Sequence, residues 1–384
     1  IRISVGRNML KIQKPVLHLI KLAGLFFGLS SLANAQHSEF EVTVLGQYDV
    51  PWALEFLPDD RLLLSEMRGA LKLLDQDGQM LGDISGVPEV AYGGQGGFGD
   101  IVLHPDFSRN QMLYMSYAEA GSSNTAGAAV ARAKLELTAN GGQLSDLEVI
   151  WRQVPKVTGQ GHFGHRIVFG PNGYLWISSG ERQKFDPAQD MESNLGKVVR
   201  LNVDGTVPAD NPFPYGEVTS EIWSLGHRNP LGMAFDESGR LWDVEMGPRG
   251  GDELNLVRRG SNYGYPEVSN GDHYNGLPIP DHDTRPEFSP PAITWTPVIS
   301  PSSMMFYDGD MFPQWRGDAF IGGLSSMALI RIDFNGDTAW EAERYEMNRR
   351  IRDVEQGPDG ALWLLEGGRD SRNGEGYLLK LTAP

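Results

Sequence analysis

One phrase recurs along the chain and limits the folds open to it: an apolar strand, a turn built from Pro, Asp, Asn or Gly, and a second apolar or aromatic strand. Six copies, the fifth more divergent, begin at Trp52, Gly99, His165, Leu231, Ser303 and Ile351. Pro-Asn-Gly and Pro-Asp-Gly turns between alternating residues are typical of β-hairpins. The sequence therefore predicts six similar hairpins.

Hairpins that cannot bury both faces alone must stack against one another, and a radial stack of six is a β-propeller. The 47 glycines and 24 prolines favour many turns over long helices. We expect an all-β fold, a six-bladed β-propeller. A β-sandwich or a solenoid of similar hairpins is the alternative.

Residues 1–35 differ from the rest of the chain. A basic stretch leads into the apolar run LAGLFFGLSSL, which ends at Ala33-Asn34-Ala35. This is the pattern of a secretory signal peptide with an A-x-A cleavage site, and its apolar part is too short to span a membrane. We expect residues 36–384 to form a single domain in the periplasm or outside the cell, with no membrane span.

Charge and cysteine content exclude several classes of function. The formal net charge is −17, and removing a basic leader makes the remainder still more acidic. Nucleic acid and anionic membranes are therefore poor candidates as partners. The chain has no cysteine, which excludes disulfides, thiolate metal sites and thiol nucleophiles.

The loops just before the repeats should converge at one mouth of the propeller channel. They span residues 93–100, 159–166, 225–232, 294–303 and 348–353, and they are rich in arginine, histidine and amides but poor in acids. The guanidinium fork binds carboxylate or phosphate, so an anion is the expected ligand. Arg350 and Arg352 would share a face in an extended segment. Pairing with Asp353 and other surface acids is the alternative for these two arginines.

His162 and His165 lie in the second of these loops. Their H-x-x-H spacing would suit a metal on a helix, but the segment is strand-like, so the two side chains should point apart. We expect one histidine to face the channel and the other to pack within the blade. Glu181, after the next strand, could orient a histidine through its ring N–H. The alternative is that both histidines are structural.

A Gly/Pro-rich loop with acids, GPRGGDELNLVRRGSNYGYP, begins at Gly247. Backbone carbonyls beside Asp252 and Glu253 are the hard oxygen donors that calcium prefers. An ordinary acidic turn is the alternative.

Several phrases together resemble one family. They are HPDF at 104–107, HFGHR at 162–166, NVDGTVPADNPF at 202–213, GHRNPLG at 226–232, GPRGGDELN with NYGYP, and RIRDVEQGPDG at 350–360. The set is similar to the soluble quinoprotein sugar dehydrogenases of the glucose/sorbosone dehydrogenase family, and within it to the aldose sugar dehydrogenases of bacterial periplasm. The resemblance implies a six-bladed propeller whose mouth binds pyrroloquinoline quinone (PQQ) and Ca²⁺.

The resemblance also implies roles for individual residues. His162 matches the catalytic base, Glu181 the acid that orients it, and Gln95 a residue of the sugar pocket. The positions that match quinone contacts are Arg228, Asn229, Trp295, Arg350 and Arg352. The carbonyls of Gly247 and Pro248 match those that hold calcium beside the quinone, while Glu253 and Tyr263 match ligands of a structural calcium. The chain departs from the family at Ser325, where a lysine is frequent, and at Met246, where a polar side chain is usual.

The implied function is oxidation of the anomeric hydroxyl of an aldose to a lactone. His162 would accept the proton, and the hydride would pass to PQQ, polarised by calcium and Arg228. Electrons would leave to an unidentified acceptor, and the protein would be a monomer or a homodimer.

Two alternatives stay open. A calcium-dependent hydrolase of the lactonase kind would need inward carboxylates and no clustered arginines. A non-catalytic binding propeller that has lost its cofactor would be consistent with Ser325 and Met246.

Overall fold

The structure is a computed structural model that describes residues 39–368 and 374–384. Regular structure in this part of the chain is almost entirely β. The exceptions are the four-residue helix α1 (Phe107–Asn110) and the short 3₁₀ turns Asp186–Ala188, Thr219–Glu221, His282–Thr284 and Pro313–Trp315. None of the described helices has the length and apolar character needed to cross a membrane. The predicted signal peptide lies outside the described residues.

The first two hairpins belong to one eight-stranded sheet of order β2-β3-β4-β5-β9-β8-β7-β6. Its strands are β2 (Pro51–Phe56), β3 (Leu62–Glu66), β4 (Ala70–Leu74), β5 (Met80–Ser85), β6 (Phe98–Leu103), β7 (Met112–Ala120), β8 (Ala126–Thr138) and β9 (Gly141–Arg152). Each half of the sheet is an antiparallel meander. Among the described strands, the halves are hydrogen-bonded to each other where β5 runs parallel to β9.

The sheets that follow are four-stranded among the described residues. One contains β10 (Gly164–Phe169), β11 (Leu175–Ser179), β12 (Lys197–Leu201) and β13 (Ile222–Leu225). The next contains β14 (Pro230–Phe235), β15 (Leu241–Glu245), β17 (Asp252–Leu256) and β19 (Ile293–Trp295). A small pair, β16 (Arg249–Gly250) with β18 (Gly271–Asp272), extends beyond it.

Two more four-stranded sheets complete the described fold. One contains β20 (Pro301–Phe306), β21 (Ala319–Gly323), β22 (Ala328–Asn335) and β23 (Thr338–Glu346). The other joins β24 (Ile351–Gln356), β25 (Leu362–Glu366) and β26 (Glu375–Thr382) to the N-terminal strand β1 (Glu41–Asp49). β1 pairs antiparallel with β26, so strands from the two ends of the described chain share a sheet.

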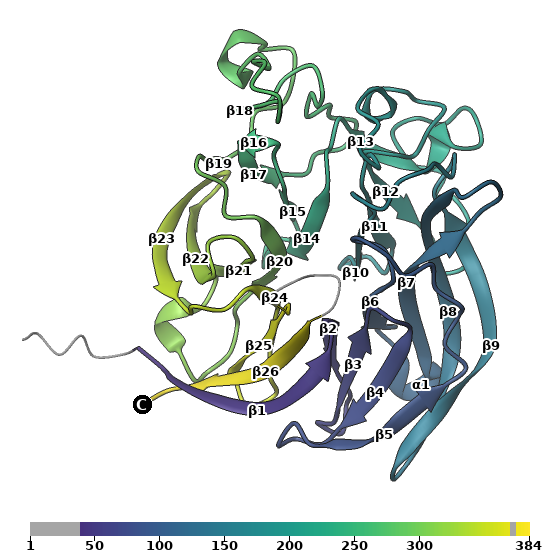
Figure 1. Cartoon of the computed structure of the whole chain (residues 1–384), viewed down its shortest axis with the longest axis vertical. Helices are drawn as coiled ribbons and strands as arrows, with labels where there is room; N and C mark the ends of the chain where they lie inside the picture. The colour runs from purple at the N-terminus through teal and green to yellow at the C-terminus, as the bar shows by residue number, and fades with distance from the viewer. Residues whose placement is uncertain (1–38, 369–373) are drawn as a thin grey trace, which may run out of the picture. The chain divides into compact units, whose positions relative to one another are not determined.

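Every repeat phrase forms the predicted antiparallel hairpin, namely β2–β3, β6–β7, β10–β11, β14–β15, β20–β21 and β24–β25. The first strands of these hairpins contact one another in the cyclic order β2, β6, β10, β14, β20, β24 and back to β2. Figure 1 shows the sheets of residues 39–384 radiating from these first strands. The prediction of an all-β, propeller-like fold is confirmed.

Each of the six hairpins carries a register shift near the start of its first strand. In β2, for example, Pro51 pairs with Glu66 and Ala53 with Ser65, so Trp52 is the additional residue. Such a bulge re-aims side chains and is frequent next to functional sites. The additional residue is Leu231 in β14, Ser302 in β20 and Arg352 in β24. The shift in β10 falls between Gly164 and Ile167.

The apolar core lies between the two halves of the eight-stranded sheet and between neighbouring sheets. Leu63 of β3 and Met115 of β7 belong to one cluster, and Val244 of β15 and Ile321 of β21 to another. This arrangement turns the start of every first strand toward the common centre, which brings the six preceding loops together.

Candidate functional site

His162 and Glu181 form the central pair of the site. His162 precedes β10, Glu181 follows β11, and the antiparallel pairing of these strands puts both residues at the same end of the sheet. The His162 ring pairs with the Glu181 carboxylate through Nδ1, which leaves Nε2 as the ring nitrogen available to a ligand. The His162 backbone N–H donates to Gln95 Oε1 at 2.7 Å.

The surroundings keep this pair in its neutral-histidine, charged-carboxylate form. Burial lowers the pKa of His162 below its usual range. The bond to Glu181 would raise this pKa, whereas the charges of Arg228 and Arg182 lower it further. Burial alone would raise the pKa of Glu181, but the bond to His162 and a backbone N–H from Phe185 hold it below its usual range. The Phe185 N–H lies 2.7 Å from Glu181 Oε2. A neutral imidazole in this position can accept a proton.

The pair opens onto a cavity of about 320 Å³, which we call the histidine cavity. Ligand pockets typically span about 300–1,000 Å³. Besides the pair, it is lined by Gln183, Phe185, Arg228, Pro248, Tyr265, His273, Tyr274 and Asn275. The sequence reading missed its aromatic wall, because Phe185 and the 273–275 segment lie in loops whose conformation has no local signal.

Glu245 holds the backbone of Arg228 and Asn229 in place. Glu245 Oε2 accepts the backbone N–H groups of Arg228, at 2.5 Å, and of Asn229, at 3.2 Å. The Arg228 guanidinium donates to Met246 O at 2.7 Å and to Tyr274 Oη at 3.2 Å. Arg228 Nε and Asn229 Nδ2 are buried and have no hydrogen-bond partner among the described residues. These unpaired donors suit a ligand rich in acceptor oxygens.

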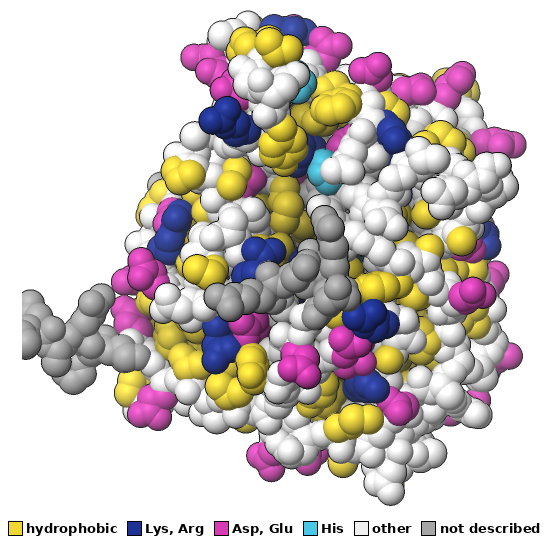
Figure 2. Space-filling view, viewed as in Figure 1, with side chains coloured by type: hydrophobic (Ala, Val, Ile, Leu, Met, Phe, Trp, Pro, Cys, Tyr) yellow, Lys and Arg dark blue, Asp and Glu magenta, His cyan; other side chains and the backbone are white. Residues whose placement is uncertain are grey.

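A second cavity of about 190 Å³, the arginine cavity, lies at the centre of the sheet arrangement. Arg350 and Arg352 both line it, as their spacing predicts, together with Gln95. Burial and the charge of Arg350 lower the pKa of Arg352 to about 10. Figure 2 shows dark-blue basic side chains and yellow hydrophobic ones around this centre. The bulge residues Trp52, Leu231 and Arg352 are part of its wall, so the register shifts shape this cavity.

His165 also lines the arginine cavity but is chemically different from His162. Its ring stacks on Phe163 at 5.3 Å between centroids and meets Trp52 edge-on at 6.1 Å. Burial lowers the pKa of His165 to about 3, so the ring is neutral. Both histidines thus reach the centre of the fold, one at each cavity.

A third, small cavity of about 10 Å³ is adjacent to the other two, since Met246 also lines the arginine cavity and Arg228 the histidine cavity. Three of the four predicted calcium residues, Gly247, Glu253 and Tyr263, lie around it. Pro248, the fourth, lines the histidine cavity instead. The carbonyl of Tyr263 accepts a hydrogen bond from His282 Nε2 at 3.1 Å.

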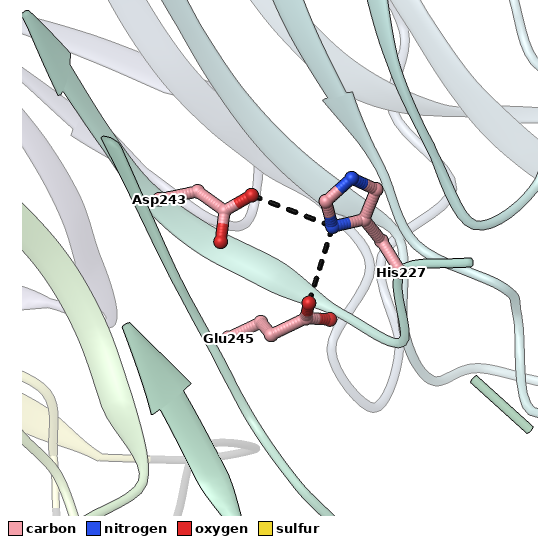
Figure 3. A group of neighbouring side chains, drawn as sticks. All are labelled: His227, Asp243 and Glu245. Carbon is pink, nitrogen blue, oxygen red and sulfur yellow. Dashed lines mark hydrogen bonds and ion pairs between the residues drawn. The ribbon is translucent and has the colours of Figure 1, made fainter. Parts of the chain in front are cut away.

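A cluster of buried charges lies beside the small cavity (Figure 3). His227 Nδ1 is 3.1 Å from Glu245 Oε1 and 3.4 Å from Asp243 Oδ2. Burial alone would lower the pKa of His227, but Asp243 and Glu245 raise it above its usual range. His227 therefore balances part of the carboxylate charge. The cluster fixes the loop that carries Arg228 and Asn229.

The structure does not bring Trp295 to this group. It lies in β19, the last strand of its sheet, where the ring packs in the core and Nε1 donates to Glu341 Oε2 at 2.8 Å. Ser325 is exposed, and its hydroxyl donates to Ser300 Oγ at 2.8 Å. Met246 contributes an apolar wall to two of the three cavities.

Known proteins are similar to this chain over most of its length. The family model for glucose/sorbosone dehydrogenases matches residues 48–380. The chain is 41% identical over 362 residues to an aldose sugar dehydrogenase of Escherichia coli K12, covering 92% of this chain and 96% of that protein. It is 27% identical to quinoprotein glucose dehydrogenase B of Acinetobacter calcoaceticus over 421 residues, 88% of this chain and 87% of that protein.

Among solved structures, the PQQ-bound form of an aldose sugar dehydrogenase from Streptomyces coelicolor superposes with a TM-score of 0.73. The identity is 29%, and the alignment covers 89% of this chain and 98% of the other. Because the family model and the Escherichia coli relative each cover nearly all of the described fold, this chain belongs to the glucose/sorbosone dehydrogenase family.

Proposed function

We propose that this chain is a PQQ-dependent aldose dehydrogenase that oxidises the anomeric hydroxyl of a sugar to a lactone with the help of calcium. The observation that carries the proposal is the His162–Glu181 pair, which opens onto the same cavity as Arg228. A carboxylate-oriented, neutral imidazole beside a guanidinium can remove a hydroxyl proton where negative charge develops.

His162 acts as the general base. Its Nε2 accepts the proton of the anomeric hydroxyl, while Glu181 holds the ring through Nδ1 and stabilises the imidazolium that forms. The C1–H bond breaks with its electron pair, and the C1–O bond becomes the lactone carbonyl. The aromatic wall of Phe185, Tyr265 and Tyr274 excludes water and positions the sugar ring. PQQ, when bound, supplies the electrophilic carbonyl that accepts the hydride.

The residues at the centre fit a quinone with several carboxylates. Arg228, Arg350 and Arg352 supply guanidinium groups, and Arg228 Nε and Asn229 Nδ2 are buried donors without partners among the described residues. The neighbouring arginines Arg352, which is buried, and Arg350, which is half-buried, would be stabilised by an anion. Ser325 supplies no cation, so binding would depend on these three arginines and on Asn229.

Calcium would be held by oxygens around the small cavity. The carbonyls of Gly247 and Pro248 would hold one ion beside the quinone, and Glu253 and Tyr263 would hold a second, structural ion. Gly247, Glu253 and Tyr263 line the small cavity, and Pro248 lines the histidine cavity. A divalent cation here would offset the carboxylate charge and act as a Lewis acid close to Arg228.

We further propose a six-bladed propeller, because the eight-stranded sheet divides into two meanders at its parallel junction. Residues 36–384 would form that single domain after cleavage of a signal peptide, in the periplasm or outside the cell. The substrate is an aldose and the electron acceptor is unidentified. Either a monomer or a homodimer is compatible with this proposal.

The lactonase alternative would place its substrate at the buried carboxylates. The cavity beside Glu245 and Glu253 measures about 10 Å³, close to the ~10–15 Å³ that one water requires. It suits an ion rather than a sugar, whereas the clustered arginines suit the dehydrogenase.

The test is PQQ- and calcium-dependent dye reduction by the purified mature protein with a panel of aldoses. His162→Asn should lower kcat by about 10²–10⁴-fold. The variant should still bind PQQ, measured by equilibrium dialysis, because its arginines are intact.

His104→Gln is the matched control, since His104 lies after the far end of β6 and its Nδ1 accepts the Asp106 N–H. Turnover that survives His162→Asn would contradict the assigned base. If the wild type binds no PQQ at all, the dehydrogenase proposal fails and a binding propeller is left.

A further inference from the structure

Arg182 is an arginine that the fold buries completely. It follows Glu181 directly, its side chain is inaccessible to solvent, and its backbone has a left-handed φ of +61°. Arginine is almost never fully buried unless it is paired, because removing a guanidinium from water is costly. A burial of this kind requires a physical reason.

No carboxylate among the described residues lies within ion-pair distance of Arg182, and its Nε and Nη1 have no hydrogen-bond partner there. Burial lowers the pKa of Arg182 to about 10, which still leaves it charged at neutral pH. The side chain is therefore not explained by a salt bridge.

Three close contacts tie Arg182 to one segment, Gly159–Phe163. Its backbone N–H donates to His162 O at 3.1 Å, and Nη2 donates to Gly159 O at 2.7 Å. The guanidinium carbon lies 3.6 Å from the centroid of the Phe163 ring. Arg182 thus holds the loop before, at and after His162.

The Gly159–Phe163 loop has a strained backbone. Within it, His162 has a left-handed φ of +52°, and His165, two residues beyond its end, has +83°. Gln183 and Phe185, on the opposing loop, have +59° and +65°. Non-glycine residues adopt this region only where the surrounding structure enforces it, and such positions concentrate at functional sites. Two strained loops that face each other need a brace between them.

We infer that Arg182 is a positioning residue that braces the Gly159–Phe163 loop and sets the orientation of the His162 ring toward the histidine cavity. For its effect on turnover the inference rests on the proposed dehydrogenase function. Its effect on the His162 ring does not depend on that function.

The charge of Arg182 has a second effect on the same ring. Glu181 favours the protonated imidazole, whereas Arg228 and Arg182 disfavour it, and burial acts in the same direction as the two arginines. The other titratable groups that line the histidine cavity are Tyr265, His273 and Tyr274. Removal of Arg182 should make His162 easier to protonate.

The experiment compares Arg182→Met and Arg182→Lys with the wild type. Met keeps an apolar contact with Phe163 but removes the charge and the bond to Gly159, whereas Lys keeps the charge. In Arg182→Met, NMR titration of the cofactor-free protein should show a raised pKa of the His162 ring. With cofactor, kcat should fall by about 10- to 100-fold with KM and PQQ affinity unchanged. Arg182→Lys should restore the ring's pKa.

Arg200→Met is the matched control. Arg200 is also buried and lies over aromatic rings, 4.5 Å from Tyr174 and 4.5 Å from Trp223, but it bonds to Asn211 and Asp210. An unchanged His162 titration and unchanged kcat in Arg182→Met, relative to Arg200→Met, would overturn the inference. If Arg182→Met does not fold, Arg182→Lys decides, because a lysine cannot brace Gly159 and Phe163 together and kcat should still fall. A wild type without turnover refutes the proposed function alone, since the titration needs no activity.

Discussion

His165 shows how a polar residue can be kept in the centre of this fold without a hydrogen bond. Both its ring nitrogens are buried without partners among the described residues, and the ring lies between Phe163 and Trp52. Its pKa of about 3 is far below that of an exposed histidine because burial disfavours the charged ring. In the folded protein the neutral His165 ring packs like an apolar aromatic side chain.

This behaviour leads to a prediction about acid stability. Between pH 6.5 and about 3 the unfolded chain binds a proton at His165 and the folded chain does not, so stability is lost as pH falls. His165→Phe should remove that term, which is about 2 kcal/mol between pH 7 and pH 5. Urea unfolding of the cofactor-free protein at both pH values measures it.

At pH 7 the same variant should differ from the wild type by less than about 1.5 kcal/mol, because the larger phenyl ring borders the arginine cavity and replaces two buried nitrogens that have no partner among the described residues. Parallel pH profiles of the two proteins would show that His165 titrates normally in the folded state.

The sequence predicted some of these single residues and not others. A histidine of the 159–166 loop oriented by Glu181 was predicted from the loop itself, and the resemblance to a family assigned the base to His162. Arg350 and Arg352 were predicted because alternate residues share a face. Arg182 could not be predicted, since an arginine in a loop is ordinarily exposed. Phe185 was missed because its left-handed backbone comes from tertiary packing, not from local preference.

At the level of the strand, the bulge at the start of each first strand determines what reaches the centre. Under strict alternation, successive side chains of a strand point to opposite faces of the sheet. The additional residue in each hairpin breaks that alternation and turns these side chains into the arginine cavity. The hairpins were predictable from their turns, but the bulges were not, because a one-residue irregularity leaves no mark on the hydrophobic pattern.

Strands β15 and β17 carry the carboxylates of the small cavity, and their pairing sets Glu245 opposite Glu253. Burial and the neighbouring acid Glu245 raise the pKa of Glu253 well above its usual range. Burial also raises the pKa of Asp243 to about 7. Glu253 must lose its proton when it binds a metal.

We therefore expect calcium to stabilise the protein more at pH 8 than at pH 6. At a calcium concentration of 100 times the Kd at pH 8, the gain in free energy of unfolding at pH 8 should be about 2.7 kcal/mol. At the same concentration the gain at pH 6 should be smaller. Calorimetric Tm values with calcium and with chelator, at both pH values, provide the measurement.

Glu253→Gln should lose this stabilisation, whereas the exposed Glu237→Gln should keep it. Equal calcium effects in the two variants would rule out Glu253 as a ligand.

For the whole ring of sheets, Arg166 is the residue that connects the parts. From β10 it donates to Leu231 O of β14, at 3.0 Å, and to Asp100 of β6, at 2.9 Å. It also donates to Ser302 O of β20, at 3.3 Å, and to Asp353 of β24, at 3.0 Å. Its guanidinium carbon lies 4.7 Å from the Trp52 ring of β2. One side chain therefore contacts the first strands of all the other repeats.

Replacing Arg166 should affect the entire fold. Arg166→Met leaves Asp100 and Asp353 buried without their counter-charge, which typically costs about 3–5 kcal/mol. Thermal or urea unfolding should show a single transition at a lower midpoint, because all the sheets built on the six hairpins lose a contact at once.

Arg258→Met is the comparison, since Arg258 and Asp337 form an exposed pair that should contribute about 0–1 kcal/mol. Similar losses in the two variants would mean that Arg166 does not connect the sheets energetically. Adding Asp100→Asn and Asp353→Asn to Arg166→Met should recover part of the stability.

The sheet that joins β1 to β26 has a consequence for the order of events during synthesis. The ribosome produces β1 among the first described residues and β26 last, yet β26 lies between β1 and β25. The ring of sheets cannot close until β26 has been synthesised. A chain that stops early leaves two strands without their shared neighbour, and unpaired strand edges invite aggregation and proteolysis. Chains that lack β26 should therefore be degraded more readily than chains that contain it.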